Sequence, residues 1–257
     1  MTPAQIRLDI VEIGRRLYQR GLISGNEGNV SIRDGDAVWV TPSGVCKGFL
    51  TPDMIVKTDL DGKQLEGRLR VSSEVLMHTA IYARRRDVGA VVHAHPPTAT
   101  GFAVAGIPLD RPLIAEAVVT LGAVPVVPYG TPSTDELSRN VGDAICDAHA
   151  MLLANHGALA VGEDVHRAWE RMETVEQLAR ISLVARQLGG GNLLPAAAVE
   201  RLEGLRGNYG YPPPGCVACP ECGGEVRVGA GDELLLKRDE LVELIAQAVE
   251  QLGPTRT

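Results

Sequence analysis

The sequence predicts an α/β protein in which helices flank a central, mainly antiparallel sheet, with a small C-terminal extension. Two observations lead to this fold class. Segments with helical periodicity and segments with strand periodicity are mixed along the chain, and they lack the regular strand–helix–strand alternation that builds parallel sheets. The 257 residues are 45% hydrophobic, as in globular proteins, but only 4% aromatic, so the core is expected to be mainly aliphatic.

The N-terminal elements follow from apolar spacing and turn residues. Residues 3–20 predict a helix, because apolar side chains recur on one face from Ile6 to Leu17 and Gly21 is a natural terminator. Alternating valine and isoleucine residues on both sides of a turn at residues 34–36 predict a β-hairpin. Further helices are predicted over residues 72–86, 114–121, 134–148 and 164–188, and strands over residues 56–59, 88–95, 123–128, 150–154 and 158–161.

The strand in Val88–Pro97, VGAVVHAHPP, ends in two histidines. Side chains two apart on a strand point the same way, so His93 and His95 share one face, with their α-carbons about 6.6 Å apart. Imidazoles at this separation can converge on one metal ion. The alternative is a pair of core histidines that are satisfied by hydrogen bonds.

His156 is a third candidate ligand, because it also stands at the end of an apolar strand, before Gly157. Three histidines with an open coordination position are typical of a catalytic zinc site. Glu74, near the start of a predicted helix, is a candidate fourth ligand or proton carrier. The alternative for Glu74 is a carboxylate that only complements the helix dipole.

Three small polar loops offer hydroxyl groups and backbone N–H groups, and together they predict a phosphate cradle that uses no Lys or Arg. Each loop taken alone is equally compatible with an ordinary turn or helix cap. The candidate phosphate-binding residues are Asn29, Ser43, Gly44, Ser72 and Ser73.

Several motifs occur in one order along roughly residues 6–205: GNEGNVSIR, TPSG, LEGRLRVSSE with the following HTAIY, VVHAHP and ANHG. This set resembles the class II aldolase family, which includes fuculose-1-phosphate aldolase, rhamnulose-1-phosphate aldolase and ribulose-5-phosphate 4-epimerase. The resemblance implies a three-layer α/β/α fold and a homotetramer with active sites between subunits. It also implies Zn2+ bound by His93, His95 and His156, and a substrate phosphate held by the cradle residues.

Glu74 follows the two serines, where family aldolases carry Glu and the epimerases carry Asp. The resemblance therefore implies a lyase that cleaves a ketose 1-phosphate, such as L-fuculose 1-phosphate, to dihydroxyacetone phosphate and an aldehyde such as lactaldehyde. Glu74 would move the proton at C3 of dihydroxyacetone phosphate. A methylthioribulose-1-phosphate dehydratase, a pentulose-5-phosphate 4-epimerase and a binding module without activity remain alternatives.

Family aldolases also use a tyrosine from a neighbouring subunit to protonate the aldehyde oxygen. No tyrosine stands in residues 109–121, where it is expected, so Tyr209 or Tyr211 in the tail becomes the candidate acid. The alternative is that both are ordinary packed or loop tyrosines.

The composition changes after Leu205, and this change predicts three parts of the chain. They are a catalytic domain over residues 1–206, a linker region over residues 207–237 and an amphipathic helix over residues 238–257. Cys216, Cys219 and Cys222 resemble one knuckle of a zinc ribbon, so a second metal ion is a possibility beside free thiols. Residues 225–237 predict a hairpin. The final helix resembles peptides that carry enzymes into bacterial microcompartments, so a shell protein is a candidate partner; alternatively, the helix docks on its own subunit.

Charge and hydropathy exclude several other classes of partner. The net charge is −7 and no basic run occurs, which argues against a nucleic-acid partner. No apolar run approaches the ~18 residues that a membrane span needs. The N-terminus lacks an apolar signal core, so a cytoplasmic protein is expected.

Overall fold

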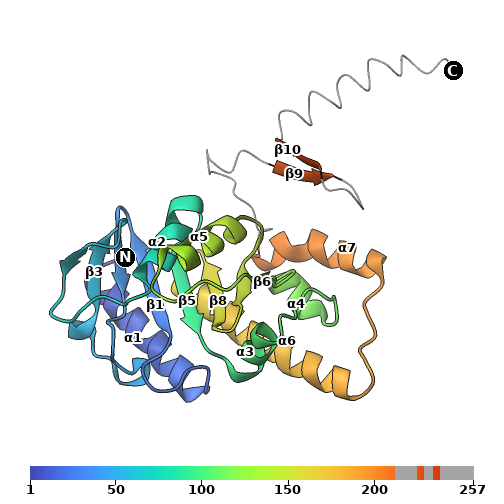
Figure 1. Cartoon of the computed structure of the whole chain (residues 1–257), viewed down its shortest axis with the longest axis horizontal. Helices are drawn as coiled ribbons and strands as arrows, with labels where there is room; N and C mark the ends of the chain where they lie inside the picture. Colours follow the sequence, from blue (N-terminus) through green and yellow to red (C-terminus); the bar gives the residue numbers. More distant parts are fainter. Residues whose placement is uncertain (212–224, 229–233, 238–257) are drawn as a thin grey trace, which may run out of the picture.

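The computed structural model describes residues 1–211 and the two strands at residues 225–228 and 234–237. Its main sheet has eight strands: β1 (Asn29–Asp34), β2 (Ala37–Val40), β3 (Val56–Asp59), β4 (Gln64–Glu66), β5 (Ala90–Ala94), β6 (Val126–Val127), β7 (Ala150–Leu153) and β8 (Gly157–Gly162). Their order across the sheet is β4-β3-β2-β1-β5-β8-β7-β6. Figure 1 labels five of these strands, β3, β1, β5, β8 and β6. Only the β6–β7 pair is parallel, which confirms the predicted mainly antiparallel sheet.

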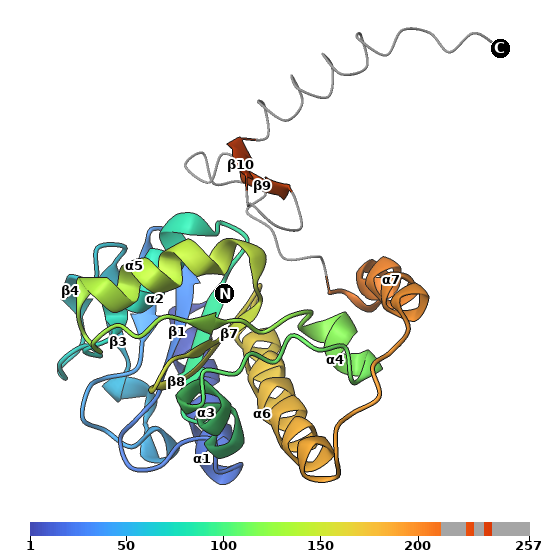
Figure 2. The same ribbon diagram turned by 45° about the vertical axis from the view of Figure 1, so that its right-hand side comes forward.

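Helices cover both faces of this sheet: α1 (Pro3–Gln19), α2 (Val75–Arg84), α3 (Pro97–Val104), α4 (Ala115–Thr120), α5 (Asp135–Ala144) and α6 (Val165–Gln187). A seventh helix, α7 (Ala196–Leu205), packs against α4. Val92 of β5 packs in one hydrophobic cluster with α1, α3 and α6, whereas Val91 packs in another with α2 and α5. Figure 2 shows α2 and α5 on one side of the sheet and α1 and α3 on the other. The three-layer α/β/α fold is therefore confirmed.

The two longest helices form for the reasons read from the sequence. In α1, Ile6, Ile10 and Ile13 are at most 1% exposed, and the Thr2 hydroxyl caps the helix by accepting the Gln5 N–H. The Asp164 carboxylate caps α6 in the same way, by accepting the Arg167 N–H at 2.8 Å. Each helix thus begins at a side-chain cap and buries one apolar stripe against the sheet.

The helix predicted over residues 72–86 begins later than expected, at Val75. Ser72 is not the N-cap: its hydroxyl accepts the Glu74 N–H at 3.3 Å and closes a turn, and Glu74 itself takes the N-cap position without capping the helix through its side chain. The Glu74 carboxylate is therefore available to the site described below.

Prolines explain the other differences from prediction. Pro96 and Pro97 end the His93 strand as expected, but they also begin α3, because proline is tolerated in the first turn of a helix. Buried Glu176 stabilises this start by accepting the N–H groups of Thr98 and Ala99. The strand predicted over residues 123–128 shrinks to the two residues of β6, which lie between two prolines that cannot donate ladder bonds.

Two further segments differ from prediction. The helix predicted over residues 134–148 ends at Ala144 and continues only as a 3-10 turn, Ile145–Asp147. Helix α7, by contrast, was not predicted at all.

In the tail, β9 (Glu225–Val228) and β10 (Leu234–Lys237) pair antiparallel, as predicted for a hairpin. The three tail cysteines and the helix predicted over residues 238–257 lie outside the described residues. Within the described ranges, no helix is long and apolar enough to cross a membrane.

Candidate active site

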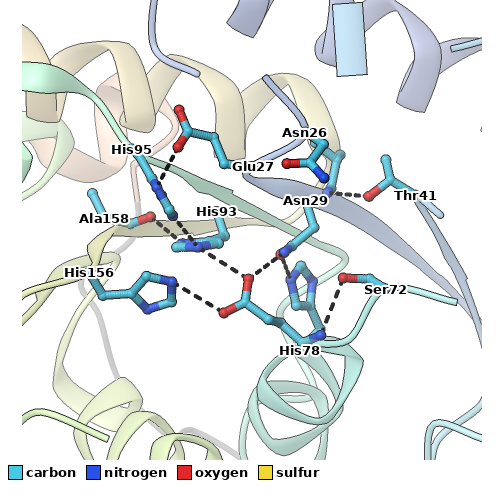
Figure 3. A network of polar contacts seen from close by, with 12 residues as sticks. Asn26, Glu27, Asn29, Thr41, Ser72, His78, His93, His95, His156 and Ala158 are labelled. Atoms are coloured by element: carbon cyan, nitrogen blue, oxygen red, sulfur yellow. Dashed lines mark hydrogen bonds and ion pairs between the residues drawn. The ribbon is translucent and has the colours of Figure 1, made fainter. Parts of the chain in front are cut away.

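The three candidate ligand histidines come from the end of one strand and from the turn that leads into its neighbour. His93 and His95 stand at the end of β5, and His156 lies in the turn between β7 and β8 (Figure 3). Because β5 pairs with β8, with Ala94 opposite Ala158, the turn reaches the end of β5. Gly157 permits this approach, since a Cβ there would lie 2.6 Å from the Ala94 carbonyl oxygen.

The geometry of the three imidazoles suits one metal ion. One ligand nitrogen from each ring lies within 4.8 Å of the others, and the Nε2 atoms of His93 and His95 are 3.2 Å apart. A tetrahedral ion with bonds of about 2.0–2.1 Å holds its ligands about 3.3 Å apart. The Glu74 carboxylate faces the same point, with Oε2 3.4 Å from His93 Nε2 and Oε1 3.2 Å from His156 Nε2.

Outer contacts orient two of the rings. His93 donates from Nδ1 to the Ala158 carbonyl oxygen at 2.9 Å, and His95 donates from Nδ1 to the Glu27 carboxylate at 3.0 Å. Both contacts leave Nε2 as the lone-pair nitrogen that faces the common point. This arrangement, in which the second nitrogen is held by an acceptor, is usual for metal-binding histidines.

The electrostatics of the site also fit a bound cation. Burial, with the neighbouring His156 and His95, lowers the pKa of His93 well below its usual value, and burial likewise lowers the pKa of His156. Both rings are therefore neutral, the form that binds metal. Glu74 Oε1 is buried without a hydrogen-bond partner among the described residues. This unpaired oxygen and the three-imidazole donor set fit a divalent metal ion.

A buried chain of hydrogen bonds ends on Glu74. Asn29 donates from Nδ2 to Glu74 Oε2 at 2.8 Å, so its Oδ1 is free to accept from His78 Nε2. Burial lowers the pKa of His78 to about 4, so the neutral ring protonated at Nε2 must accept at Nδ1. There the Ser31 hydroxyl donates at 2.7 Å, and Ser31 in turn accepts from the Tyr82 hydroxyl at 2.7 Å. Every donor in the chain points toward Glu74.

Sequence reasoning missed this network. His78 and Tyr82 are four residues apart on α2, and this spacing places both side chains on one helix face. A histidine and a tyrosine at that spacing, directly after the Ser–Ser–Glu segment, are the signal that could have indicated it.

A cavity of about 240 Å³ opens beside the histidines, and all five predicted cradle residues line it: Asn29, Ser43, Gly44, Ser72 and Ser73. Glu74, His95 and His156 line the same cavity. Lys47 also lines this cavity, a cation that the predicted cradle does not include. Sequence reasoning missed Lys47 because only the folded chain shows that this side chain is buried there.

The structure does not bring Tyr209 to the histidines of its own chain. It lies on the 3-10 turn Arg206–Tyr209 after α7, is 62% exposed and does not line the cavity. Tyr211 packs beneath the Arg167 guanidinium, whose carbon lies 4.2 Å from the ring centroid.

Comparison with known proteins decides the family. Residues 8–183 match the family model described as Class II Aldolase and Adducin N-terminal domain. The chain belongs to this family. An L-fuculose phosphate aldolase of Methanococcus maripaludis is 34% identical over 183 residues, which cover 70% of this chain and 97% of the relative.

Other class II relatives carry different activities in their names. A 5-methylthioribulose-1-phosphate/5-deoxyribulose-1-phosphate aldolase of Rhodospirillum rubrum is 35% identical, covering 80% of this chain and 92% of the relative. A 3-oxo-tetronate 4-phosphate decarboxylase of Escherichia coli O6:H1 is 34% identical, covering 70% and 86%. The solved structure of an L-fuculose 1-phosphate aldolase superposes with a TM-score of 0.74 at 30% identity, covering 82% of this chain and 99% of that one.

Proposed function

We propose that the protein is a zinc-dependent aldehyde-lyase that cleaves a ketose 1-phosphate to dihydroxyacetone phosphate and an aldehyde. L-Fuculose 1-phosphate and 5-deoxyribulose 1-phosphate are the substrates that the names of its relatives favour. The observation that carries the proposal is the position of the Glu74 carboxylate, 3.2–3.4 Å from two of the three histidines and in the wall of the cavity that the polar loops surround.

The residues have separate tasks in this reaction. Asn29, Ser43, Gly44, Ser72 and Ser73 anchor the phosphate, and His93, His95 and His156 hold the metal ion. When bound, the metal ion polarises the substrate oxygens and stabilises the negative charge that bond cleavage leaves. Cleavage of the C3–C4 bond leaves the electron pair on C3, and Glu74 delivers the proton that completes dihydroxyacetone phosphate.

We propose Tyr209 of a neighbouring subunit as the acid–base residue at the aldehyde oxygen, in a homotetramer whose catalytic domain is residues 1–206. During cleavage it takes the proton of the C4 hydroxyl, and in the reverse, aldol-forming direction it returns that proton to the aldehyde oxygen. Its exposure leaves the hydroxyl available to a site outside its own chain. A mass measurement by light scattering on the full chain tests the assembly, and a monomer would rule out this source of the acid.

Decarboxylation is the second candidate function, favoured by the 34% identical decarboxylase. In a 3-oxo-tetronate 4-phosphate the C1–C2 bond breaks and CO₂ leaves. The electron pair stays on C2, whose protonation gives dihydroxyacetone phosphate. Both reactions therefore leave an electron pair on the carbon next to the ketone, and protonation of that carbon gives dihydroxyacetone phosphate in each. The same histidines, Glu74 and phosphate cradle would serve both reactions.

The test is a coupled assay for dihydroxyacetone phosphate, with metal content measured on the same samples. The substrates are fuculose, rhamnulose and 5-deoxyribulose 1-phosphates and 3-oxo-tetronate 4-phosphate. Metal-dependent release that collapses in Glu74→Gln supports the proposal, and aldehyde or CO₂ as co-product separates the two functions. No release from any of them, with about one metal ion still bound per chain, would overturn both. Loss of water from methylthioribulose 1-phosphate or epimerisation of a pentulose 5-phosphate would then identify the dehydratase or epimerase.

We also propose a cytoplasmic enzyme whose residues 238–257 bind a microcompartment shell protein, because a released aldehyde is reactive and such shells confine aldehydes. A fluorescent protein fused to residues 238–257 should then bind a shell protein; a fusion that binds none contradicts the proposal.

Metal analysis of a Cys216→Ser variant tests whether the three tail cysteines bind a second ion. An unchanged metal content would leave them as free thiols.

A further inference from the structure

Lys47 lines the active-site cavity, and its ammonium group is bound to the carbonyl oxygen of Asn26, another lining residue. Lys47 is 3% exposed. It begins the 3-10 turn Lys47–Phe49, shortly after the Ser43–Gly44 loop. The side chain donates from Nζ to the carbonyl oxygens of Asn26 and Val45, the latter at 2.9 Å. Among the described residues, Lys47 is the only lysine or arginine that lines this cavity.

The charge of Lys47 is not balanced by the described residues in contact with it. Both acceptors are neutral carbonyls, and none of the ion pairs found within 4.0 Å in the described part of the chain includes Lys47. Burial lowers the pKa of Lys47, and Cys46, Glu74 and Glu27 offset this only in part. A buried cation without a close counter-ion destabilises a fold unless a ligand supplies the charge.

The groups beside Lys47 are those that an anion needs. The hydroxyls of Ser43 and Ser73 make no hydrogen bond within the described part of the chain, and both residues line the cavity. Gly44, with a φ of +71° and an exposed backbone, completes the same wall. An ammonium has three donors, and the two carbonyl contacts leave one of them unused.

We propose that Lys47 is the counter-charge for the substrate phosphate, and that its third N–H donates to a phosphate oxygen. The inference rests on the proposed function and deepens it, because it makes a dianionic phosphate monoester, rather than a free sugar, the class of ligand that this cavity selects. Charge-assisted hydrogen bonds of this kind are about twice as strong as neutral ones.

A purely structural role is the competing explanation. The carbonyl groups of Asn26 and Val45 belong to two different loops, so Lys47 also ties these loops together. Its backbone is packed as well, since a Cβ at Gly14 of α1 would lie 2.6 Å from the Lys47 carbonyl oxygen. A tie between loops would affect phosphorylated and unphosphorylated ligands alike, whereas a counter-charge affects only the phosphorylated ones.

The test uses metal-loaded full-length protein, with Lys47→Met as the neutral variant, Lys47→Arg as the charged variant and the exposed Lys63→Met as the matched control. Inorganic phosphate binding is measured by calorimetry, and KM is measured for a ketose 1-phosphate and for the same ketose without phosphate. We expect Lys47→Met to weaken phosphate binding and raise KM for the phosphorylated ketose by about 30-fold or more. Lys47→Arg should retain most of the affinity, and Lys63→Met and the free ketose should show no change.

Equal phosphate affinity in wild type and Lys47→Met, or a parallel loss for both ketoses, would overturn the inference. If Lys47→Met does not fold, ¹⁵N-lysine NMR of the wild-type protein decides: the buried ammonium signal must shift when phosphate replaces chloride, and an unchanged signal contradicts the inference. The calorimetric measurement of phosphate binding does not require the protein to catalyse a reaction. Lys47-dependent phosphate binding in a protein that releases no dihydroxyacetone phosphate would therefore refute the proposed reaction and leave this inference standing.

Discussion

Asn29 and Glu74 are 45 residues apart in the chain, yet the Asn29 side-chain amide donates to the Glu74 carboxylate at 2.8 Å. Asn29 begins β1 and lies opposite His93 in the β1–β5 pair, so the sheet register places this donor beside the histidine cluster. The Tyr82–Ser31–His78 chain fixes the amide from the other side. The carboxylate that is proposed to carry the proton is therefore held by Asn29, which lines the cavity, and Asn29 is in turn held by Ser31, His78 and Tyr82, which do not line it.

Asn29→Asp should lower kcat by about 100-fold, because it replaces the donor with a second carboxylate that repels Glu74. The exposed Asn192→Asp, between α6 and α7, is the control for an added charge and should be neutral. Steady-state kinetics with metal content on the same samples check the result. An Asn29→Asp enzyme with more than half of the wild-type kcat would contradict the orienting role.

His78 should make the fold less stable in acid. The unfolded chain protonates His78 below about pH 6.5, whereas burial holds its pKa in the fold at about 4. Between these values the unfolded state binds more protons, so the free energy of unfolding falls as pH decreases. From pH 7 to pH 5 the wild type should lose about 2 kcal/mol more than His78→Gln, measured by urea unfolding of metal-free protein. Parallel pH profiles would show that His78 does not titrate as described.

Glu27→Gln should weaken metal binding by about 10- to 100-fold, since the Glu27 carboxylate accepts from His95 Nδ1 at 3.0 Å and raises the basicity of Nε2. Burial raises the Glu27 pKa, but hydrogen bonds from Ser24 and the nearby His95 outweigh this and lower it overall, so Glu27 is ionised at neutral pH. Competition with a chromophoric chelator measures the affinity, and the exposed Glu200→Gln is the control. The same affinity in both variants would show that Glu27 does not tune the site.

A shared active site predicts complementation between two inactive variants. Glu74→Gln and Tyr209→Phe chains should each have at most about 1% of wild-type activity. In mixed assemblies, a site that combines Glu74 of a Tyr209→Phe chain with Tyr209 of a Glu74→Gln neighbour regains both groups. Co-expressed variants with different tags should therefore recover activity, and mixed assemblies as inactive as their parents would place the acid elsewhere.

The elements that sequence reasoning located are those whose signals are local. The apolar stripe of α1 and the alternation in β1, β2 and β5 reflect periodicities that the chain itself carries. Helix α3 was missed because a Pro–Pro pair ends a strand and begins a helix equally well, and the deciding contact, Glu176, is 77 residues away. Lys47 was beyond sequence reasoning for the same reason, since it differs from a surface lysine only once the fold encloses it. His78, by contrast, left a local signal in its four-residue spacing from Tyr82 on α2.

Hydrogen exchange at C3 of dihydroxyacetone phosphate in D₂O tests the central claim most directly, because it reports proton transfer by Glu74 without requiring the aldehyde to be known. The metal-loaded wild type should wash out one of the two C3 protons in the ¹H NMR spectrum, whereas Glu74→Gln and chelator-treated protein should exchange at least about 100-fold more slowly. Wild-type protein that contains metal and binds dihydroxyacetone phosphate but exchanges no faster than Glu74→Gln would contradict the account.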